Sequence, residues 1–229
     1  MRLATVAGAL LLAASAFALA ATAGGLPSYT APGAQAPAPE DKQLTTREVI
    51  ARLFQTAPGT RPDLVALNLT RMDLAEVDFK SARLDGADLY GADLSRANLA
   101  GASLVGVRLN RATITATDFS GADLTDAQIL RPTTFTSLEV VTAEAPKFKG
   151  ARLVRIRSDG WLDRADFTGA DLTGAVFGGG ASREETLFAP ASLISANFTD
   201  ATLRQAKFPE AHLKYARFNG ADLTDANLR

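Results

Sequence analysis

The chain has 229 residues, carries 24 basic against 25 acidic side chains, and contains one histidine and no cysteine. This near-neutral charge excludes a general attraction to nucleic acid or to anionic membranes, although it is compatible with a local charged patch. The absence of cysteine excludes disulfides, thiol nucleophiles and zinc-thiolate centres, so that stability must come from packing and hydrogen bonds.

Residues 1–23 have the layout of a cleaved secretory signal. Met1 and Arg2 form a positively charged start, a long apolar run without charge follows, and A-x-A sites stand at Ala18–Ala20 and Ala21–Ala23. The alternative is an uncleaved membrane anchor, because the run is near the lower length for spanning a bilayer. The small-residue sites favour cleavage. We therefore expect a periplasmic or secreted protein with no lipobox cysteine and no stable membrane insertion after cleavage.

A linker and a short helix are expected next. Residues 24–41 are rich in proline and alanine, which is typical of a flexible or extended linker. Residues 42–61 are predicted to hold a capping helix and its lead-in, because Thr45 and Glu48 have the spacing of a capping box. The apolar stripe of this helix consists of Val49, Ile50, Leu53 and Phe54. Since so short a helix is marginal alone in water, we expect the stripe to cover the open end of the structure that follows.

A five-residue repeat occupies residues 62–131. On an α-helix, a spacing of five advances about 500° and spreads the apolar residues around the surface. On a straight strand, an odd spacing alternates between the two faces. Only a chain that turns at every pentapeptide keeps all of these residues inside. The repeat centres are Leu64, Leu69, Leu74, Phe79, Leu84, Leu89, Leu94, Leu99, Leu104, Leu109, Ile114, Phe119, Leu124 and Ile129.

The repeat returns in residues 188–229 after an irregular segment. Residues 132–187 break the register more than once, and we expect them to form irregular coils and loops. Within this segment Phe148 and Leu153 resume the repeat, and Leu162 begins a run that is one residue out of step. The centres of the last block are Phe188, Leu193, Phe198, Leu203, Phe208, Leu213, Phe218, Leu223 and Leu228.

The stretches ARLDG-ADLYG-ADLSR-ANLAG-ASLVG and ADFTG-ADLTG resemble the pentapeptide-repeat family, whose consensus is A(D/N)LXX. The resemblance implies an all-β fold, a right-handed quadrilateral β-helix with four pentapeptides per coil, here preceded by the short N-terminal helix. It also implies that the central Leu or Phe and the preceding Ala point inward. Stacked columns are then expected, such as Leu64, Leu84, Leu104 and Leu124, or Phe79, Leu99 and Phe119.

No catalytic constellation stands out in the sequence. The only histidine, His212, falls on an outward position and is interpreted as a surface residue. The recurring aspartates can bond the turn backbone at each corner, or alternatively form a paired-carboxylate site, and the first interpretation is favoured. These residues are Asp88, Asp93, Asp118, Asp123, Asp166, Asp171 and Asp222. The sequence therefore predicts a protein that is not an enzyme, with no catalytic residue, no cofactor and no metal.

Charge is distributed unevenly along the chain. Residues 62–131 hold ten acidic and seven basic side chains, whereas 188–229 hold four acidic and five basic ones. A basic run lies between these blocks, and the only tryptophan follows it; the run comprises Lys147, Lys149, Arg152, Arg155 and Arg157. Basic and aromatic side chains at a break in a regular scaffold are typical of a binding surface. The partner-binding candidates are Arg155, Arg157, Asp159 and Trp161. The alternative is a solvated charged face with Trp161 tucked into the core.

These patterns favour an exported, non-catalytic scaffold that binds another macromolecule, an unidentified protein or another envelope component, through a rod-like surface. Nucleic acid is not expected as a partner. One alternative comes from the family resemblance, which includes mimics of B-form DNA that bind topoisomerases; it requires a chain that is not exported. The other is an enzyme acting on envelope polysaccharides, which needs clustered carboxylates in an open groove.

The carboxyl end suggests self-association. The repeats run to Leu228 without a helix or polar segment behind them, and solenoid ends are normally capped. Two copies that abut their last coils would form a closed twofold contact. We therefore predict a weak homodimer through Leu223 and Leu228.

Overall fold

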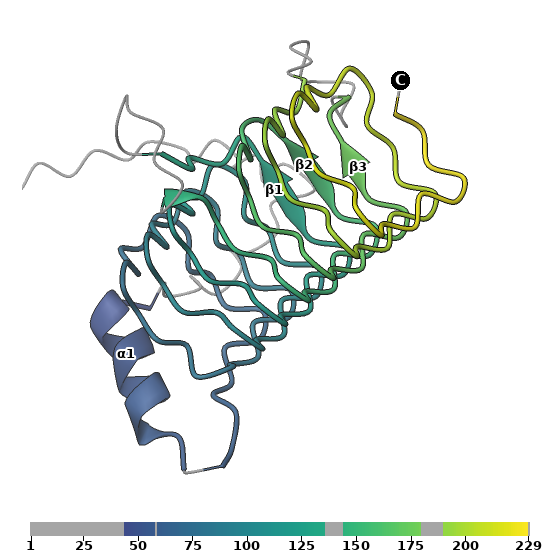
Figure 1. The fold of residues 1–229 in the computed structure, drawn as a ribbon. Helices are drawn as coiled ribbons and strands as arrows, with labels where there is room; N and C mark the ends of the chain where they lie inside the picture. Colours follow the sequence, from purple (N-terminus) through teal and green to yellow (C-terminus); the bar gives the residue numbers. More distant parts are fainter. Residues whose placement is uncertain (1–43, 58, 136–143, 180–189, 229) are drawn as a thin grey trace, which may run out of the picture. The chain divides into compact units, whose positions relative to one another are not determined.

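The computed structural model describes residues 44–57, 59–135, 144–179 and 190–228, all of which belong to the compact unit Asp41–Arg229. The regular elements of this part of the chain are the helix α1 (Thr46–Gln55) and the short strands β1 (Gln128–Leu130), β2 (Arg157–Asp159) and β3 (Val176–Phe177). The strands pair in parallel in the order β1-β2-β3 and lie side by side in Figure 1. The predicted signal and linker fall outside the described residues.

Most of the chain winds into coils that isolated parallel bridges hold together. In the first block each bridge joins residues twenty apart. Four bridges occur in each turn of the chain; those of the first turn are Asp63–Arg83, Asn68–Asp88, Asp73–Asp93 and Asp78–Asn98. Because four pentapeptides make twenty residues, each side chain lies over the equivalent side chain of the next coil, and Figure 1 shows the coils stacked in this way.

The repeat centred on Leu94 shows how the backbone amides remain hydrogen-bonded although the chain turns at every pentapeptide. The amides of Asp93, Leu94 and Arg96 donate to carbonyls of neighbouring coils over 2.9, 2.8 and 2.8 Å. The amide of Ala97 closes a turn by donating to the Leu94 carbonyl over 2.9 Å. The remaining amide, that of Ser95, donates to Oδ1 of Asp93 over 2.9 Å. Every backbone N–H of the repeat is satisfied, which confirms the interpretation of the recurring aspartates as turn-bonding residues.

Some repeats lack Asp or Asn before the centre and use a side chain of the preceding coil instead. Ser103 occupies that position in one repeat, and the amide of Val105 donates to Oδ1 of Asp85 over 3.1 Å. In a later coil the amide of Ile194 donates to Oδ1 of Asp163 over 2.9 Å. An acidic side chain of the preceding coil can therefore replace the Asp or Asn as the acceptor for this amide.

The inward positions form a continuous apolar core. The fourteen predicted centres from Leu64 to Ile129 are all fully buried, which confirms their assignment to the interior. Further along, phenylalanines form one column with ring centroids 5.1, 5.0, 4.9 and 5.0 Å apart, in the order Phe119, Phe148, Phe167, Phe198 and Phe218. These spacings are close to the distance of about 4.8 Å between neighbouring strands, so each coil contributes one ring.

The coil stack continues across the breaks in the sequence register. Along one column the bridged pairs are Asp118–Lys147, Lys147–Asp166, Asp166–Asn197 and Asn197–Arg217, which are 29, 19, 31 and 20 residues apart. Residues 144–179 of the segment predicted as irregular therefore lie in stacked coils, whereas 136–143 and 180–189 lie outside the described residues. Just before Leu162, where the register shifts by one residue, a buried Ser158 replaces the usual apolar centre. Its hydroxyl donates to the Ile129 carbonyl over 3.1 Å.

Helix α1 covers the first coils with part of its predicted stripe. The capping box is present, since the amide of Glu48 donates to Oγ1 of Thr45 and the amide of Thr45 donates to the Glu48 carboxylate. Val49 and Leu53, which are four residues apart and share one helix face, are buried against the core. Phe54, predicted to belong to the covering stripe, is 75% exposed, because it lies about 100° further around the helix.

Candidate interaction surface

Trp161 lies on the outside of the coils. Its side chain is 66% exposed, and its backbone pairs with Ser192 of the next coil. The alternative of a tryptophan tucked into the core is wrong, because Leu162 takes the inward position at the frame shift and is buried. Oγ1 of Thr134 donates to the Trp161 carbonyl over 2.8 Å, which fixes the backbone beneath the exposed ring.

Arg155 is paired with an acid of the preceding coil. Its Nε and Nη2 donate to Oδ1 and Oδ2 of Asp126 over 2.7 and 2.6 Å. This bidentate contact lowers the pKa of Asp126 and raises that of Arg155, chiefly through the hydrogen bonds between them. Likewise, Nη1 of Arg152 lies 3.9 Å from Oδ2 of Asp123. The basic run of the sequence is thus partly neutralised by residues 29 positions earlier.

Arg157 and Asp159 of β2 differ in exposure. Arg157 is exposed beside its register partners Gln128 and Val176, and the described part of the chain provides it with no ion pair. Asp159 is buried, and its Oδ1 accepts from the amide of Arg131 over 2.6 Å. Of the four predicted binding residues, Arg157 and Trp161 are therefore exposed, and neither side chain forms an ion pair with another described residue. Arg155 is exposed but forms an ion pair with Asp126, and Asp159 is buried and accepts from a backbone amide.

The remaining candidates lie towards the carboxyl end. His212 is exposed, as expected of an outward position, and its backbone pairs with Ser192. Leu223 is partly buried and Leu228 is 45% exposed. The weak dimer through these leucines stays a prediction, which sedimentation across a hundredfold concentration range tests; a monomer throughout would contradict it.

The coils also bring together arginines that the sequence analysis did not single out. We define the basic face as the side of the coils whose inward centres are Leu69, Leu89, Leu109, Ile129 and Ser158. Bridges align Asn68, Asp88, Arg108, Gln128 and Arg157 along this face. At the adjoining corner, amide-to-carbonyl bonds between successive coils align Arg71, Gly91, Arg111 and Arg131. The sequence indicates this alignment only when it is compared at a spacing of twenty residues. Arg71 then lies two coils before Arg111, and Arg131 lies one coil after it.

The charge of the basic face is opposite to that of the block that contributes most of it. Residues 62–131 as a whole have seven basic and ten acidic side chains, a net of −3. The basic face carries five arginines (Arg71, Arg108, Arg111, Arg131 and Arg157) against Asp88 and Asp159, a net of +3. The acids of the block are therefore concentrated on its other sides.

Tyr90 lies on this face among polar contacts. Arg108 forms an ion pair with Asp88, and the carbon of its guanidinium is 5.0 Å from the centre of the Tyr90 ring. Burial tends to raise the pKa of Asp88, but hydrogen bonds from Arg108 and from the Tyr90 amide outweigh it and lower this pKa. The pair is consequently charged at neutral pH and holds the guanidinium over the ring.

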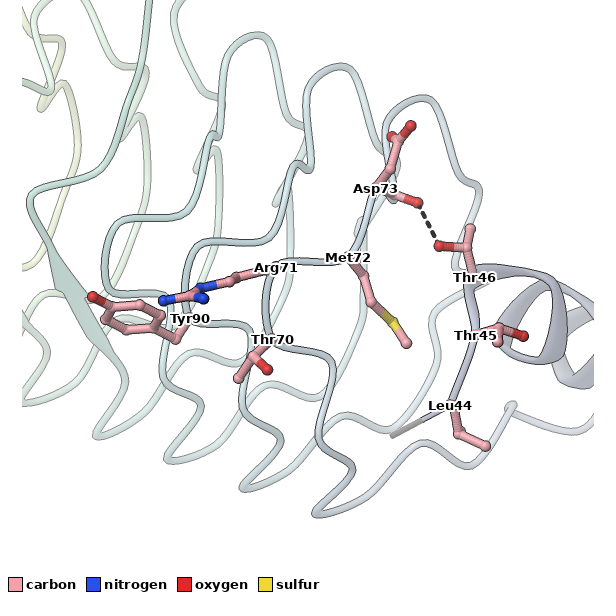
Figure 2. A pocket seen from close by; sticks show the side chains of 8 residues that line it. All are labelled: Leu44, Thr45, Thr46, Thr70, Arg71, Met72, Asp73 and Tyr90. Atoms are coloured by element: carbon pink, nitrogen blue, oxygen red, sulfur yellow. Dashed lines mark hydrogen bonds between the residues drawn. The ribbon is translucent and has the colours of Figure 1, made fainter. Parts of the chain in front are cut away.

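A cavity of about 590 Å³ opens where the basic face meets the start of α1 (Figure 2). Figure 2 shows the guanidinium of Arg71 beside the ring of Tyr90, with Met72 and Leu44 towards the helix. Oγ1 of Thr46 donates to the Asp73 carbonyl over 3.1 Å and ties the helix to the first coil. The cavity lining consists of Leu44, Thr45, Thr46, Thr70, Arg71, Met72, Asp73 and Tyr90.

Among the described residues, no group of three or more histidines, aspartates or glutamates has an arrangement that could hold a metal ion. Within the same ranges, no helix has the length and apolar character needed to cross a bilayer.

Comparison with known proteins gives a repeat family. The family profile described as "Pentapeptide repeats" matches in eight copies at residues 63–99, 92–127, 159–179 and 191–229, more than half of the chain. Among curated proteins, no sequence matches significantly.

Solved structures that match are themselves described as pentapeptide repeat proteins or as a resistance protein. HetL of the cyanobacterium Nostoc, involved in heterocyst differentiation regulation, is 22% identical, with 81% of this chain and 95% of that chain covered and a TM-score of 0.36. A protein of the Arabidopsis thaliana thylakoid lumen is 23% identical over 57% of this chain and 79% of its own, with a TM-score of 0.29. A form of QnrB1, a plasmid-mediated fluoroquinolone resistance protein, is 15% identical over 75% and 78%, with a TM-score of 0.27.

Proposed function

Because the chain belongs to the pentapeptide-repeat family, we propose that it is a non-catalytic scaffold that binds another macromolecule through the outward side chains of its coils. Family membership carries with it the right-handed quadrilateral β-helix, and four bridges in each twenty-residue turn support the quadrilateral form. In such a fold the inward positions are used for packing, so that function is left to the outward positions and to the loops.

One observation carries the binding function: the side chain of Trp161 is 66% exposed where the repeat register shifts. Exposing a large apolar ring to water is unfavourable, and such rings are enriched in the centres of interfaces. The neighbouring Arg157 has no ion pair within the described ranges, so its guanidinium is open to an acidic group of a partner.

Export is the second part of the proposal. The charged start, the apolar run and the A-x-A sites of residues 1–23 support it. The mature chain is expected to begin near Ala21 or Gly24 and to be recovered from the periplasm or the medium. Mass spectrometry of an intact chain beginning at Met1 in the cytoplasm would contradict export and leave the binding function to be sought there.

Capture experiments test the binding function. Tagged mature protein is expected to retain a partner from an envelope extract, and Trp161→Ala together with Arg157→Ala is expected to abolish the capture. Tyr215→Ala is the matched control, because Tyr215 is also an exposed aromatic, at 71%, but lies two coils further along the stack. Equal capture by the double variant and the wild type would place binding elsewhere.

A further inference from the structure

We propose that the basic face binds an acidic segment of a partner polypeptide, which runs along the coil axis and inserts an apolar side chain into the cavity beside Arg71. The inference rests on the proposed binding function and specifies the chemistry of the partner. It starts from the segregation of charge, a net of +3 on one side of a block whose net charge is −3. A segregated face attracts a complementary polymer at a distance, which an evenly mixed surface does not.

The guanidinium groups on this face are suited to carboxylates. Arg71, Arg111 and Arg157 are exposed, and none of them forms an ion pair with another described residue. A planar guanidinium donates two parallel hydrogen bonds to one carboxylate, which makes arginine the preferred residue for such pairs. Around Arg111 the neighbouring outward positions are Asn110 and Thr113, so no acid adjoins it in its own coil.

The spacing of the arginines fits an extended chain. Arg71 and Arg157 are four coils apart, with Arg111 and Arg131 in the coils between. At about 4.8 Å per coil this is roughly 19 Å, the length of about six extended residues. A peptide of this size can therefore contact arginines of several coils at once without any change in the backbone of the scaffold.

The cavity and Tyr90 favour a polypeptide over other polyanions. The cavity adjoins Arg71, and an apolar side chain of a partner would contact Leu44 and the small exposed part of Met72 there. Single-stranded nucleic acid binds through several aromatic rings on which successive bases stack. Tyr90 is the aromatic residue on the described part of this face, and the guanidinium of Arg108 already lies over its ring. A base or a sugar ring would have to displace that guanidinium from its ion pair with Asp88.

Fluorescence anisotropy of the purified mature protein tests the proposal. The probe is a fluorescein-labelled peptide of roughly ten residues, oligoglutamate with one leucine near an end. Arg111→Glu combined with Arg157→Glu is expected to raise the Kd at least about tenfold, because two attractive contacts become repulsive. The matched control is Arg83→Glu combined with Arg96→Glu, which changes the net charge equally but on other sides of the coil that precedes the coil of Arg111. It is expected to change the Kd by about twofold or less.

The outcomes are distinct. Equal losses in the two double variants, with unchanged thermal melts, would show a general charge effect and overturn the basic face. Tighter binding of an oligodeoxythymidylate or an oligogalacturonate of equal charge would overturn the polypeptide. An unchanged Kd after replacing the leucine of the probe by glycine would overturn the assignment of the cavity. Failure of wild-type protein to capture a partner from extract would refute the proposed function instead, since the anisotropy measurement does not depend on it.

Discussion

The first block and the later coils reach the same stacked arrangement in different ways. Between Asp63 and Gln128 the bridged residues are twenty apart throughout, and leucine dominates the core. In the later coils the separations are 29, 19 and 31 before they return to twenty. The phenylalanine column nevertheless continues from Phe119 to Phe218 across all of these changes. Contacts between equivalent inward side chains, rather than a constant residue count, keep the coils in register.

The physical reason lies in the narrow interior. Each coil has room for one large side chain per side, and a ring that misses its column would leave a void in one coil and overfill the next. Stacked rings about 5 Å apart gain contact on both faces. The extra residues between the bridged pairs do not interrupt the column of inward rings.

The largest expected effect comes from placing a charge in the regular block. Leu94 is fully buried, so Leu94→Asp leaves an unpaired carboxylate among apolar side chains and is expected to unfold the coils. Leu94→Ala is the milder comparison and should cost about 2–5 kcal/mol. Circular dichroism melts measure both variants. A melting temperature of Leu94→Asp within a degree or two of wild type would show that the inward assignment is wrong.

Removing a ring tests whether the later coils depend on their column. Phe167 stacks between Phe148 and Phe198, so Phe167→Ala should cost about 3–5 kcal/mol. Leu99→Ala removes a smaller side chain from the same column in the first block, and within the general range of about 2–5 kcal/mol it should cost less than Phe167→Ala. Urea unfolding of the two variants checks the order. A larger loss for Leu99→Ala would mean that the ring column does not hold the later coils together.

The two ways of satisfying the corner amide give a smaller contrast. Asp163 accepts from the hydroxyl of Ser192 over 2.5 Å and from the amide of Ile194 over 2.9 Å. Asp93 accepts within its own repeat, from the amide and the hydroxyl of Ser95. Asp163→Ala and Asp93→Ala should each lower the free energy of unfolding by about 1–3 kcal/mol. Asp163→Ala should be the more costly, because it also removes hydrogen bonds between two coils. The asparagine variants serve as controls, since an amide oxygen still accepts; equal losses for Asn and Ala would exclude the hydrogen bond as the cause.

Acid titration is expected to give the smallest effect. Hydrogen bonds from Thr224 and then Arg204 lower the pKa of Asp222 from 3.8 to about 2. Because the folded pKa lies below the unfolded one, the contribution to stability is complete above about pH 4 and is lost as the pH falls towards 2. Melting temperatures of wild type and Asp222→Asn should therefore differ at neutral pH and converge in acid. A gap that widens below about pH 4 would contradict the sign.

Much of the fold could be predicted because its determinants are local. The spacing of five, the alanine two positions before most centres and the capping box of Thr45 and Glu48 could all be recognised in the sequence, and each describes contacts within a few residues. The position of Phe54 was predicted wrongly, since an apolar stripe does not say which part of it meets the coils. The family profile agrees with the repeats that the spacing revealed.

The candidate surface was less predictable, because its contacts join residues of different coils. The run from Lys147 to Arg157 looked uniformly basic, yet Arg155 pairs with Asp126. Asp159, just beyond the run, is buried and accepts from the amide of Arg131. The run of similar charges in the sequence is consequently not a run of similar charges in space.

The sequence by itself determined which residues face inward, because a period of five keeps the apolar centres out of water only if the chain turns at every repeat. Only the tertiary structure decided which charges cancel and which accumulate. Outward side chains meet partners that lie 18 to 31 residues away, at separations that the insertions between coils change from one turn to the next. The basic face therefore exists only in the stacked coils.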